Sequence, residues 1–465
     1  MPPAPAHLHP LFVKSDAKAV PVWFVTASSI GNVASKLRAH ERAFVKASGF
    51  EPKAGQHLLL AGATGELSGV LFGIEGKSDE PKNAFLPGKL STALPAGTYR
   101  FANAPHDARL AALSFALNAY QFSRYRKRQK SGVRLVLPNG VDGDELTRIA
   151  EGVALARDLI NTPSNDMGPV ELEATARKLA KAHGAKFRSV SGKVLAKDFP
   201  LVQVVGAASA RAPRLIDFTW GRPGDPKVTL IGKGVCFDTG GLDIKSPAGM
   251  LEMKKDMGGA ATALALAHML MVGKCRVRLR VLIPAVENSI SATSFRPRDV
   301  YRARNGLSVE IGNTDAEGRL ILADALALAD DEKPELIVDF ATLTGAARVA
   351  LGPELPPFFT DDEKFARDLL AAAETENDPL WRLPLWPPYE ALLDSKIADT
   401  NNVSTGGFAG AITAALFLKK FVKRAKTWVH FDIFAWSPST KPGRPEGAEC
   451  QTARALYALL SQRYC

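Results

Sequence analysis

Residues 313–320 read NTDAEGRL and place two carboxylates and a guanidinium at alternate positions, just before an apolar run. Asp315 and Glu317 offer oxygen ligands, Arg319 offers a positive charge that could hold an anion, and Gly318 lets the backbone approach another group closely. An acidic pair before a helix is more often a match to the helix dipole than a site. The segment becomes informative only if other charged loops converge on it.

A second charged loop joins an expected strand over 228–234 to an expected helix over 258–272. Four of its residues are candidates for chemistry: Lys233, Asp238, Lys245 and Asp256. The helix that follows is almost entirely apolar, which indicates a buried element that would hold the end of the loop near the sheet. Ligands of parallel α/β sheets bind beyond the carboxyl ends of the strands, where such loops meet.

Convergence of these loops would gather Asp238, Asp256, Asp315 and Glu317 in one pocket. Four ionised carboxylates in one place are costly unless cations neutralise them. Two divalent cations would do so, and paired cations are an established means of activating water for hydrolysis. Oxygen ligands suit Mg²⁺ and Mn²⁺, and Zn²⁺ also accepts carboxylate. The residues alone therefore favour a metallohydrolase, and a phosphatase is one candidate.

The order of the expected elements predicts an α/β protein. A small N-terminal α/β domain spans 1–140, a linker helix spans 141–160, and a larger C-terminal α/β catalytic domain spans 161–465. In the larger domain strands and helices alternate, which predicts a mostly parallel central sheet flanked by helices. The strands expected there are 214–220, 228–234, 277–285, 335–343 and 428–434. The helices expected there are 170–183, 258–272, 319–330, 362–374 and 409–423. In the N-terminal domain a helix is expected over 107–125, with Asp107 as its N-cap.

The composition is that of a globular chain, with 46% apolar and 23% charged residues. No apolar run approaches the roughly 18 residues that span a bilayer, and the N-terminus lacks a signal-peptide pattern. The four cysteines are scattered and do not indicate disulfides, so we expect a cytoplasmic protein without membrane contact. Cys236, His268 and His430 lie in apolar stretches and are expected to be packed core residues. The net charge of +11 includes a basic segment over 124–130, interpreted as a solvated helix end, with nucleic-acid binding as the alternative.

Several long motifs occur together and in a fixed order. They are DLINTPSNDMGP (158–169), GKGVCFDTGGLDIKSPAGMLEMKKDMGGA (232–260), NTDAEGRL (313–320), DFATLTGA (339–346) and GAITAALFLKKFV (410–422). In these motifs the chain resembles the leucyl aminopeptidase (cytosol aminopeptidase) family, whose members are exopeptidases with two metal ions. The resemblance covers most of the second part of the chain and implies removal of N-terminal residues from peptides.

This resemblance implies two divalent metal ions per subunit, Mn²⁺ or Zn²⁺ with Mg²⁺ as a further candidate, which activate water for attack on the peptide. Asp238 and Glu317 would bridge the two ions. Asp315 would complete the first metal site, and Lys233 and Asp256 would complete the second, more exchangeable one. A lysine can bind a metal only as a neutral amine, so Lys233 would have to lose its proton.

The resemblance also assigns the groups around the metals. Lys245 and Arg319 match the family's catalytic pair, and Arg319 would hold a bicarbonate that carries the proton to the leaving amine. Met253, Thr342 and Gly345 would line the pocket for the substrate's first side chain, which suits leucine-like groups.

Two further expectations concern specificity and assembly. The segment HFDIFAW is two residues shorter than is usual in the family between its Asp-Ile pair and its tryptophan, which puts the leucine preference in question. The resemblance implies a homohexamer that acts on peptide substrates. A DNA-binding architectural role through the basic N-terminal domain is the alternative function.

Overall fold

The computed structural model describes residues 8–76, 82–127 and 132–465. The chain forms two compact units. Unit 1 comprises Met1–Ala154 and Ser439–Glu446, and unit 2 comprises Leu155–Pro438 and Gly447–Cys465. Helix α5 (Gly143–Asn161) contains the point in the sequence where unit 1 gives way to unit 2, and it covers nearly all of the segment expected to form a linker helix.

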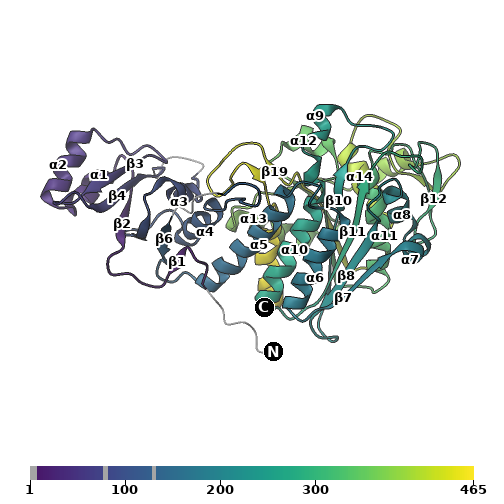
Figure 1. Ribbon diagram of the computed structural model, residues 1–465, viewed down its shortest axis with the longest axis horizontal. Helices are drawn as coiled ribbons and strands as arrows, with labels where there is room; N and C mark the ends of the chain where they lie inside the picture. The colour runs from purple at the N-terminus through teal and green to yellow at the C-terminus, as the bar shows by residue number, and fades with distance from the viewer. Residues whose placement is uncertain (1–7, 77–81, 128–131) are drawn as a thin grey trace. The chain divides into compact units, whose positions relative to one another are not determined.

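Unit 1 is built on a six-stranded sheet (Figure 1). Its strand order is β1 (Phe12–Val13), β6 (Val133–Val136), β5 (Gly97–Phe101), β2 (Val20–Val25), β4 (Leu67–Gly73) and β3 (His57–Ala61). Only the β3–β4 pair is antiparallel, because these two strands form a hairpin. The helical segments are α1 (Ile30–Ser35), α2 (Ala39–Ser48), η1 (Leu86–Lys89), α3 (Leu90–Ala93) and α4 (Ala108–Asn118).

Helix α4 begins as expected and ends earlier than expected. The Asp107 carboxylate accepts a hydrogen bond from the Leu110 amide at 2.7 Å, which confirms it as the N-cap. The helix stops at Asn118, so the prediction of a helix to residue 125 is wrong. Beyond that point aromatic residues alternate with polar and basic ones, which is not the apolar spacing of an amphipathic helix. Residues 124–127 of the basic segment are therefore not part of a helix, and its residues 128–130 lie outside the described chain.

Unit 2 contains a nine-stranded sheet. Its path runs β16 (Trp381–Arg382), β15 (Pro357–Phe359), β18 (Thr427–Asp432), β14 (Leu336–Ala341), β9 (Lys227–Gly232), β11 (Arg278–Asn288), β8 (Arg214–Trp220) and β7 (Lys186–Ser191). The ninth strand, β10 (Gly234–Asp238), pairs with β11. The central pairs β18–β14, β14–β9, β9–β11 and β10–β11 are parallel, and antiparallel pairs occur toward both edges. The predicted α/β class with a mostly parallel central sheet is confirmed.

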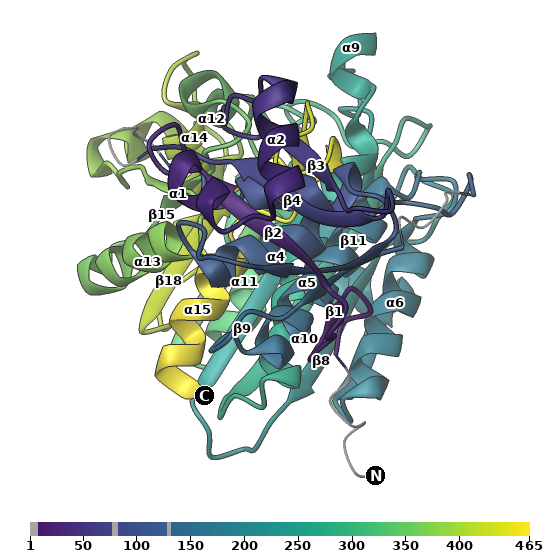
Figure 2. The ribbon, with the colours of Figure 1, turned by 90° about the vertical axis from the view of Figure 1, so that its left-hand side faces the viewer.

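Helices cover both faces of this sheet, as Figure 1 shows for α6 and α10 on one side and α8 and α11 on the other. Helix α10 (Gly258–Val272) packs on β9, on β14 and against α15 (Ala453–Tyr464), and most of its residues are apolar and buried (Figure 2). Helix α11 (Glu317–Asp330) packs against α8 (Pro200–Gly206) and α14 (Gly410–Lys419) in a shared apolar core.

Unit 2 also contains further helical segments and strands. They are α6 (Pro169–Ala182), α7 (Gly192–Asp198), α9 (Pro247–Met250), η2 (Met253–Met257), α12 (Gly345–Leu351), α13 (Glu363–Thr375), η3 (Pro387–Leu393), β12 (Val300–Arg302), β13 (Ser308–Glu310), β17 (Thr400–Asn401), β19 (Trp436–Ser437) and β20 (Gly447–Ala448). Across the described residues, no helix combines the length and the apolar character needed to cross a membrane.

One expectation about the cysteines is wrong. Cys275, just after α10, forms a disulfide with the C-terminal residue Cys465, although 190 residues separate them in sequence. The pairing arises because α10 and α15 pack together, which brings the segment after α10 close to the end of the chain. Cys236 is a free, buried cysteine, as expected. His430 is also buried, as expected, with its Nδ1 2.5 Å from a carboxylate oxygen of Asp339.

Candidate active site

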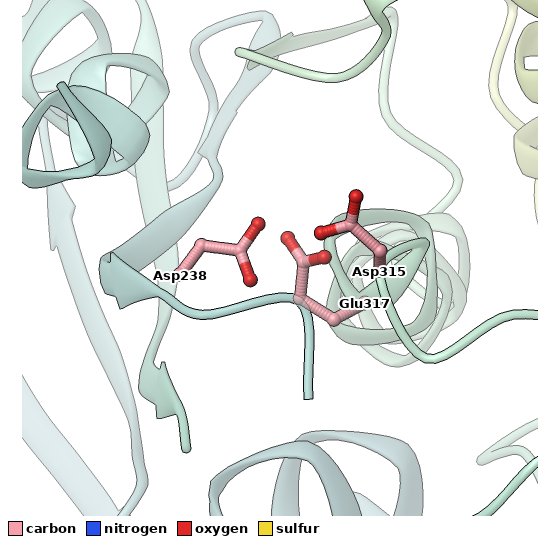
Figure 3. A group of neighbouring side chains, drawn as sticks. All are labelled: Asp238, Asp315 and Glu317. Carbon is pink, nitrogen blue, oxygen red and sulfur yellow. The ribbon is translucent and has the colours of Figure 1, made fainter. Parts of the chain in front are cut away.

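Four carboxylates converge beyond the carboxyl ends of the central strands. Asp238 is the last residue of β10, Asp256 lies in η2 just before α10, and Asp315 and Glu317 stand at the start of α11. Figure 3 shows the side chains of Asp238, Asp315 and Glu317 turned toward one another, and each offers an oxygen within 4.8 Å of the others. Asp238, Asp256 and Glu317 are buried, whereas the Asp315 side chain is 33% exposed. The predicted convergence is therefore present.

Two lysines lie among these acids and join them in pairs. Lys233 Nζ is 2.8 Å from Asp256 Oδ2 and 2.8 Å from Glu317 Oε1. Lys245 Nζ is 2.9 Å from Asp238 Oδ2 and 2.5 Å from Asp315 Oδ1. Each ammonium thus links carboxylates from two different segments of the chain.

The backbone holds Lys233 rigidly at the junction of β9 and β10. Its amide donates to the Phe340 carbonyl, and its carbonyl accepts from the Ala260 amide, each at 2.9 Å. A Cβ at position 318 would lie only 2.7 Å from Lys233 Nζ, so only glycine leaves room for this side chain. The close approach expected at Gly318 is therefore an approach to Lys233.

Two uncharged residues support the acids from behind. Asn288, at the end of β11, donates from Nδ2 to Asp238 Oδ1 at 2.9 Å. The Thr342 hydroxyl donates to Asp256 Oδ1 at 2.6 Å, and the Thr342 carbonyl accepts from Lys233 Nζ at 3.0 Å. Sequence reasoning missed Asn288, and the only available signal was a polar residue ending an apolar strand. It also treated Thr342 only as a pocket residue, whereas the buried hydroxyl positions Asp256.

Arg319 lies in the first turn of α11 and is buried. Its Nη1 donates to the Asn402 carbonyl at 2.6 Å, and among the described residues no carboxylate lies within ion-pair distance of its guanidinium. Burial lowers the pKa of Arg319 to about 10, and the opposing effect of Glu317 is smaller. The guanidinium is therefore a buried cation without a carboxylate partner in the described chain, as an anion site requires.

The other two expected pocket residues are less enclosed. Met253 is half-buried in η2, three residues before Asp256. Gly345 is exposed at the start of α12, and a Cβ there would meet nothing within 4 Å. Their joint role in one pocket stays a prediction.

The electrostatics of the cluster oppose full ionisation. Burial, followed by the charge of Asp238, raises the pKa of Glu317 to about 8. The same two causes raise the pKa of Asp315 to about 6. Burial acts to lower the pKa of Lys233, but the adjacent carboxylates of Asp256 and Glu317 outweigh it and raise that pKa. Glu317 therefore tends to hold a proton near neutral pH, and Lys233 keeps its charge.

The donor atoms fit divalent cations. Asp256 Oδ2, Asp315 Oδ1 and Glu317 Oε1 are buried, and despite their closeness to the lysines they accept no hydrogen bond of regular geometry. Four carboxylates against Lys233 and Lys245 leave a formal charge of −4 + 2 = −2. Hard carboxylate oxygens with surplus negative charge are the ligands that Mg²⁺, Mn²⁺ and Zn²⁺ accept. A mostly parallel α/β sheet with such a cluster at its strand ends defines the class of metal-dependent α/β enzymes.

Comparison with known sequences identifies the family within that class. Residues 154–457 match the profile described as "Cytosol aminopeptidase family, catalytic domain", and residues 20–138 match "M17 aminopeptidase, N-terminal domain". A "Probable cytosol aminopeptidase" of Sinorhizobium fredii is 42% identical over 342 residues, covering 69% of this chain and 68% of that protein. One of the same description from Chlamydia abortus is 44% identical over 334 residues, covering 68% of this chain and 66% of that protein.

Solved structures agree. The crystal structure of cytosol aminopeptidase from Coxiella burnetii has a TM-score of 0.93 at 46% identity and covers 98% of this chain and 100% of that one. The bottromycin maturation enzyme BotP in complex with Mn has a TM-score of 0.86 at 31% identity, covering 96% of this chain and 100% of that one. The chain belongs to the cytosol aminopeptidase family and is a metal-dependent aminopeptidase, a hydrolase. These comparisons give no support to the DNA-binding alternative.

Proposed function

We propose that this aminopeptidase holds two divalent cations between the converging loops and releases N-terminal residues from peptides. The observation that carries the proposal is the meeting of four carboxylates, three of them buried, with two lysines as their counter-ions. The residues that would hold the cations are Lys233, Asp238, Asp256, Asp315 and Glu317. When bound, the cations supply Lewis-acid polarisation of the scissile carbonyl and activation of water.

The chain's own groups then have distinct tasks. Lys233 is buried and fixed in place, so it can take part in cation binding only by giving up its proton. Lys245 is more exposed and keeps its charge, which would stabilise negative charge developing on the carbonyl oxygen. Arg319 would hold a small anion such as bicarbonate, which would pass a proton to the leaving amine. The free N-terminal amine of the substrate would bind on the Lys233–Asp256 side, which limits cleavage to the first residue.

The finer assignments follow from relatives. BotP is described in complex with Mn, so Mn²⁺ is our first choice of metal, with Zn²⁺ and then Mg²⁺ after it. The names of relatives support a cytosolic location. The family resemblance supports a homohexamer and a leucine-like preference, with Met253, Thr342 and Gly345 at the first side chain.

Metal replacement in two variants tests the proposal. Protein stripped with a chelator and refilled with Mn²⁺, Zn²⁺ or Mg²⁺ should regain cleavage of aminoacyl-anilides, and Asp256→Ala should lose nearly all of it. Glu252→Ala, four residues away in the same loop and half-buried, is the matched control and should keep the wild-type rate. Hydrolysis of a chromogenic phosphate ester without any anilide cleavage would replace the peptidase by a phosphatase.

A further inference from the structure

Lys255 is a buried lysine without a counter-ion. It lies in η2, immediately before Asp256, and only 4% of its surface is exposed. Within the described chain, its ammonium has no carboxylate at ion-pair distance and no hydrogen-bond acceptor. The adjacent Lys254 differs, because its Nζ donates to the Asn161 carbonyl at 3.0 Å.

The contact that Lys255 does make is with an aromatic ring. Its Nζ lies 4.4 Å from the centre of the Phe434 ring. The guanidinium carbon of Arg348 lies 5.7 Å from the same ring, but Arg348 is paired with Asp432. Two positive groups therefore flank Phe434, and only one of them has a carboxylate.

Asp432 is fully engaged and cannot serve both cations. Besides Arg348, it accepts hydrogen bonds from the amides of Leu343 at 3.1 Å and Thr344 at 3.2 Å, and from the Thr344 hydroxyl at 2.6 Å. These bonds hold the loop after β14, so Asp432 has a structural task. Lys255 is left as the charged group in this region whose partner the described chain does not provide.

Removing an ammonium from water without a partner is costly. An aromatic face offsets only part of that cost. A buried, unpaired lysine beside a catalytic centre is therefore suited to binding an anionic group that arrives with the substrate. Lys255 precedes Asp256 in the chain, and its ammonium interacts electrostatically with both Asp256 and Lys233. An anionic group bound to Lys255 would therefore lie close to the atoms bound at the Lys233–Asp256 side.

We propose that Lys255 binds the side-chain carboxylate of an N-terminal glutamate or aspartate, and so directs this aminopeptidase toward acidic first residues. The inference rests on the proposed function, which places the substrate's amine on the Lys233–Asp256 side. A side-chain carboxylate is two or three carbons from the carbon that bears this amine. The C-terminal carboxylate of a short peptide lies beyond the scissile bond, on the far side of the reacting carbonyl.

The test compares substrates that differ only in charge. Glutamyl-, glutaminyl- and leucyl-anilides are assayed with the Mn²⁺-loaded enzyme. The wild type should have a kcat/KM for the glutamyl substrate at least about tenfold above that for the glutaminyl one, as charged hydrogen bonds give. In Lys255→Met, of similar length but uncharged, this ratio should fall by about tenfold or more. Lys254→Met, the matched control, should keep the wild-type ratio.

Other outcomes separate the two levels of the proposal. A wild type that cleaves the leucyl substrate but shows no preference for glutamyl over glutaminyl overturns the role of Lys255 and leaves the aminopeptidase intact. Equal losses on all three substrates in Lys255→Met would mean that Lys255 only packs against Phe434. A wild type that cleaves none of the three with any metal overturns the proposed function itself. If Lys255→Met does not fold, inhibition of wild-type leucyl-anilide cleavage by free glutamate should be about tenfold stronger than by glutamine, and equal inhibition refutes the idea.

Discussion

Replacing Thr342 by valine tests whether this residue positions a metal ligand or merely lines a pocket. Valine has nearly the same shape as threonine, so Thr342→Val deletes the hydroxyl and little else. That hydroxyl donates to Asp256 Oδ1 at 2.6 Å, and both residues are buried, with 8% and 3% of their surfaces exposed. The bond from Lys233 Nζ to the Thr342 carbonyl involves the main chain and would remain.

The expected size of the effect follows from that geometry. A buried acceptor left without its donor costs about 1–3 kcal/mol. We expect the free energy of unfolding of the metal-free Thr342→Val variant to fall by that amount. Groups that orient a metal ligand typically contribute about 10- to 100-fold to metal affinity. We therefore expect the Mn²⁺ concentration for half-maximal activity to rise about tenfold or more in Thr342→Val, with a smaller change in kcat at saturating Mn²⁺.

The assay is a Mn²⁺ titration of anilide cleavage after chelation, run beside thermal unfolding. Thr342→Ser keeps the hydroxyl and loses one methyl group, so it should restore the wild-type Mn²⁺ dependence. A pocket residue behaves differently, because Thr342→Val would then change the ratio between leucyl and alanyl substrates and leave the Mn²⁺ dependence alone. That second pattern would refute the positioning role.

Three further predictions concern the same unit. Gly318→Ala would put a Cβ 2.7 Å from Lys233 Nζ, so it should lower the free energy of unfolding by about 1–3 kcal/mol and remove most of the activity. Gly31→Ala is the control, because a Cβ there meets nothing within 4 Å, and it should change neither stability nor activity. The pKa of Glu317 is raised to about 8, so protons compete with cations for its carboxylate. The apparent affinity for Mn²⁺ should therefore rise as the pH increases from 6 to about 8, and an affinity that does not change with pH would contradict this. Cys465→Ser should remove the disulfide to Cys275 and lower the free energy of unfolding by about 2–5 kcal/mol. Thiol titration of the unfolded wild type should find two free cysteines, Cys236 and Cys450.

The sequence predicted those parts of the fold that depend on periodicity and on strand order. Helix α10 and strand β8 have the limits expected, because an unbroken apolar helix and a strand bounded by polar turns leave little choice of register. Convergence of the acids followed from topology, since parallel strands present their carboxyl ends at one edge. Helix α4 was extended too far because its amphipathic spacing fades gradually into the basic segment, without a glycine or proline to mark the end.

Contacts between distant segments could not be predicted in the same way. Asn288 and Thr342 are uncharged residues at strand ends, and nothing in their local sequence shows which carboxylate they meet. The Cys275–Cys465 disulfide depends on the packing of α10 against α15, which a spacing of 190 residues does not reveal. Lys255 appeared in the sequence as one of two adjacent lysines, and only the fold distinguishes the buried one from the paired one.

The two site lysines are held differently, and this difference bears on how cations enter. Lys233 is 3% exposed, has no free space beside Gly318 and donates to the Thr342 carbonyl, so its side chain cannot swing away. Lys245 is 16% exposed and lies on the loop after β10, where movement is less restricted. An entering cation would push the Lys245 ammonium aside, whereas at Lys233 it would have to replace a proton whose binding the neighbouring acids strengthen. We therefore expect proton release to weaken cation binding at the Lys233 side relative to the other, and to make that side the more exchangeable of the two as pH falls.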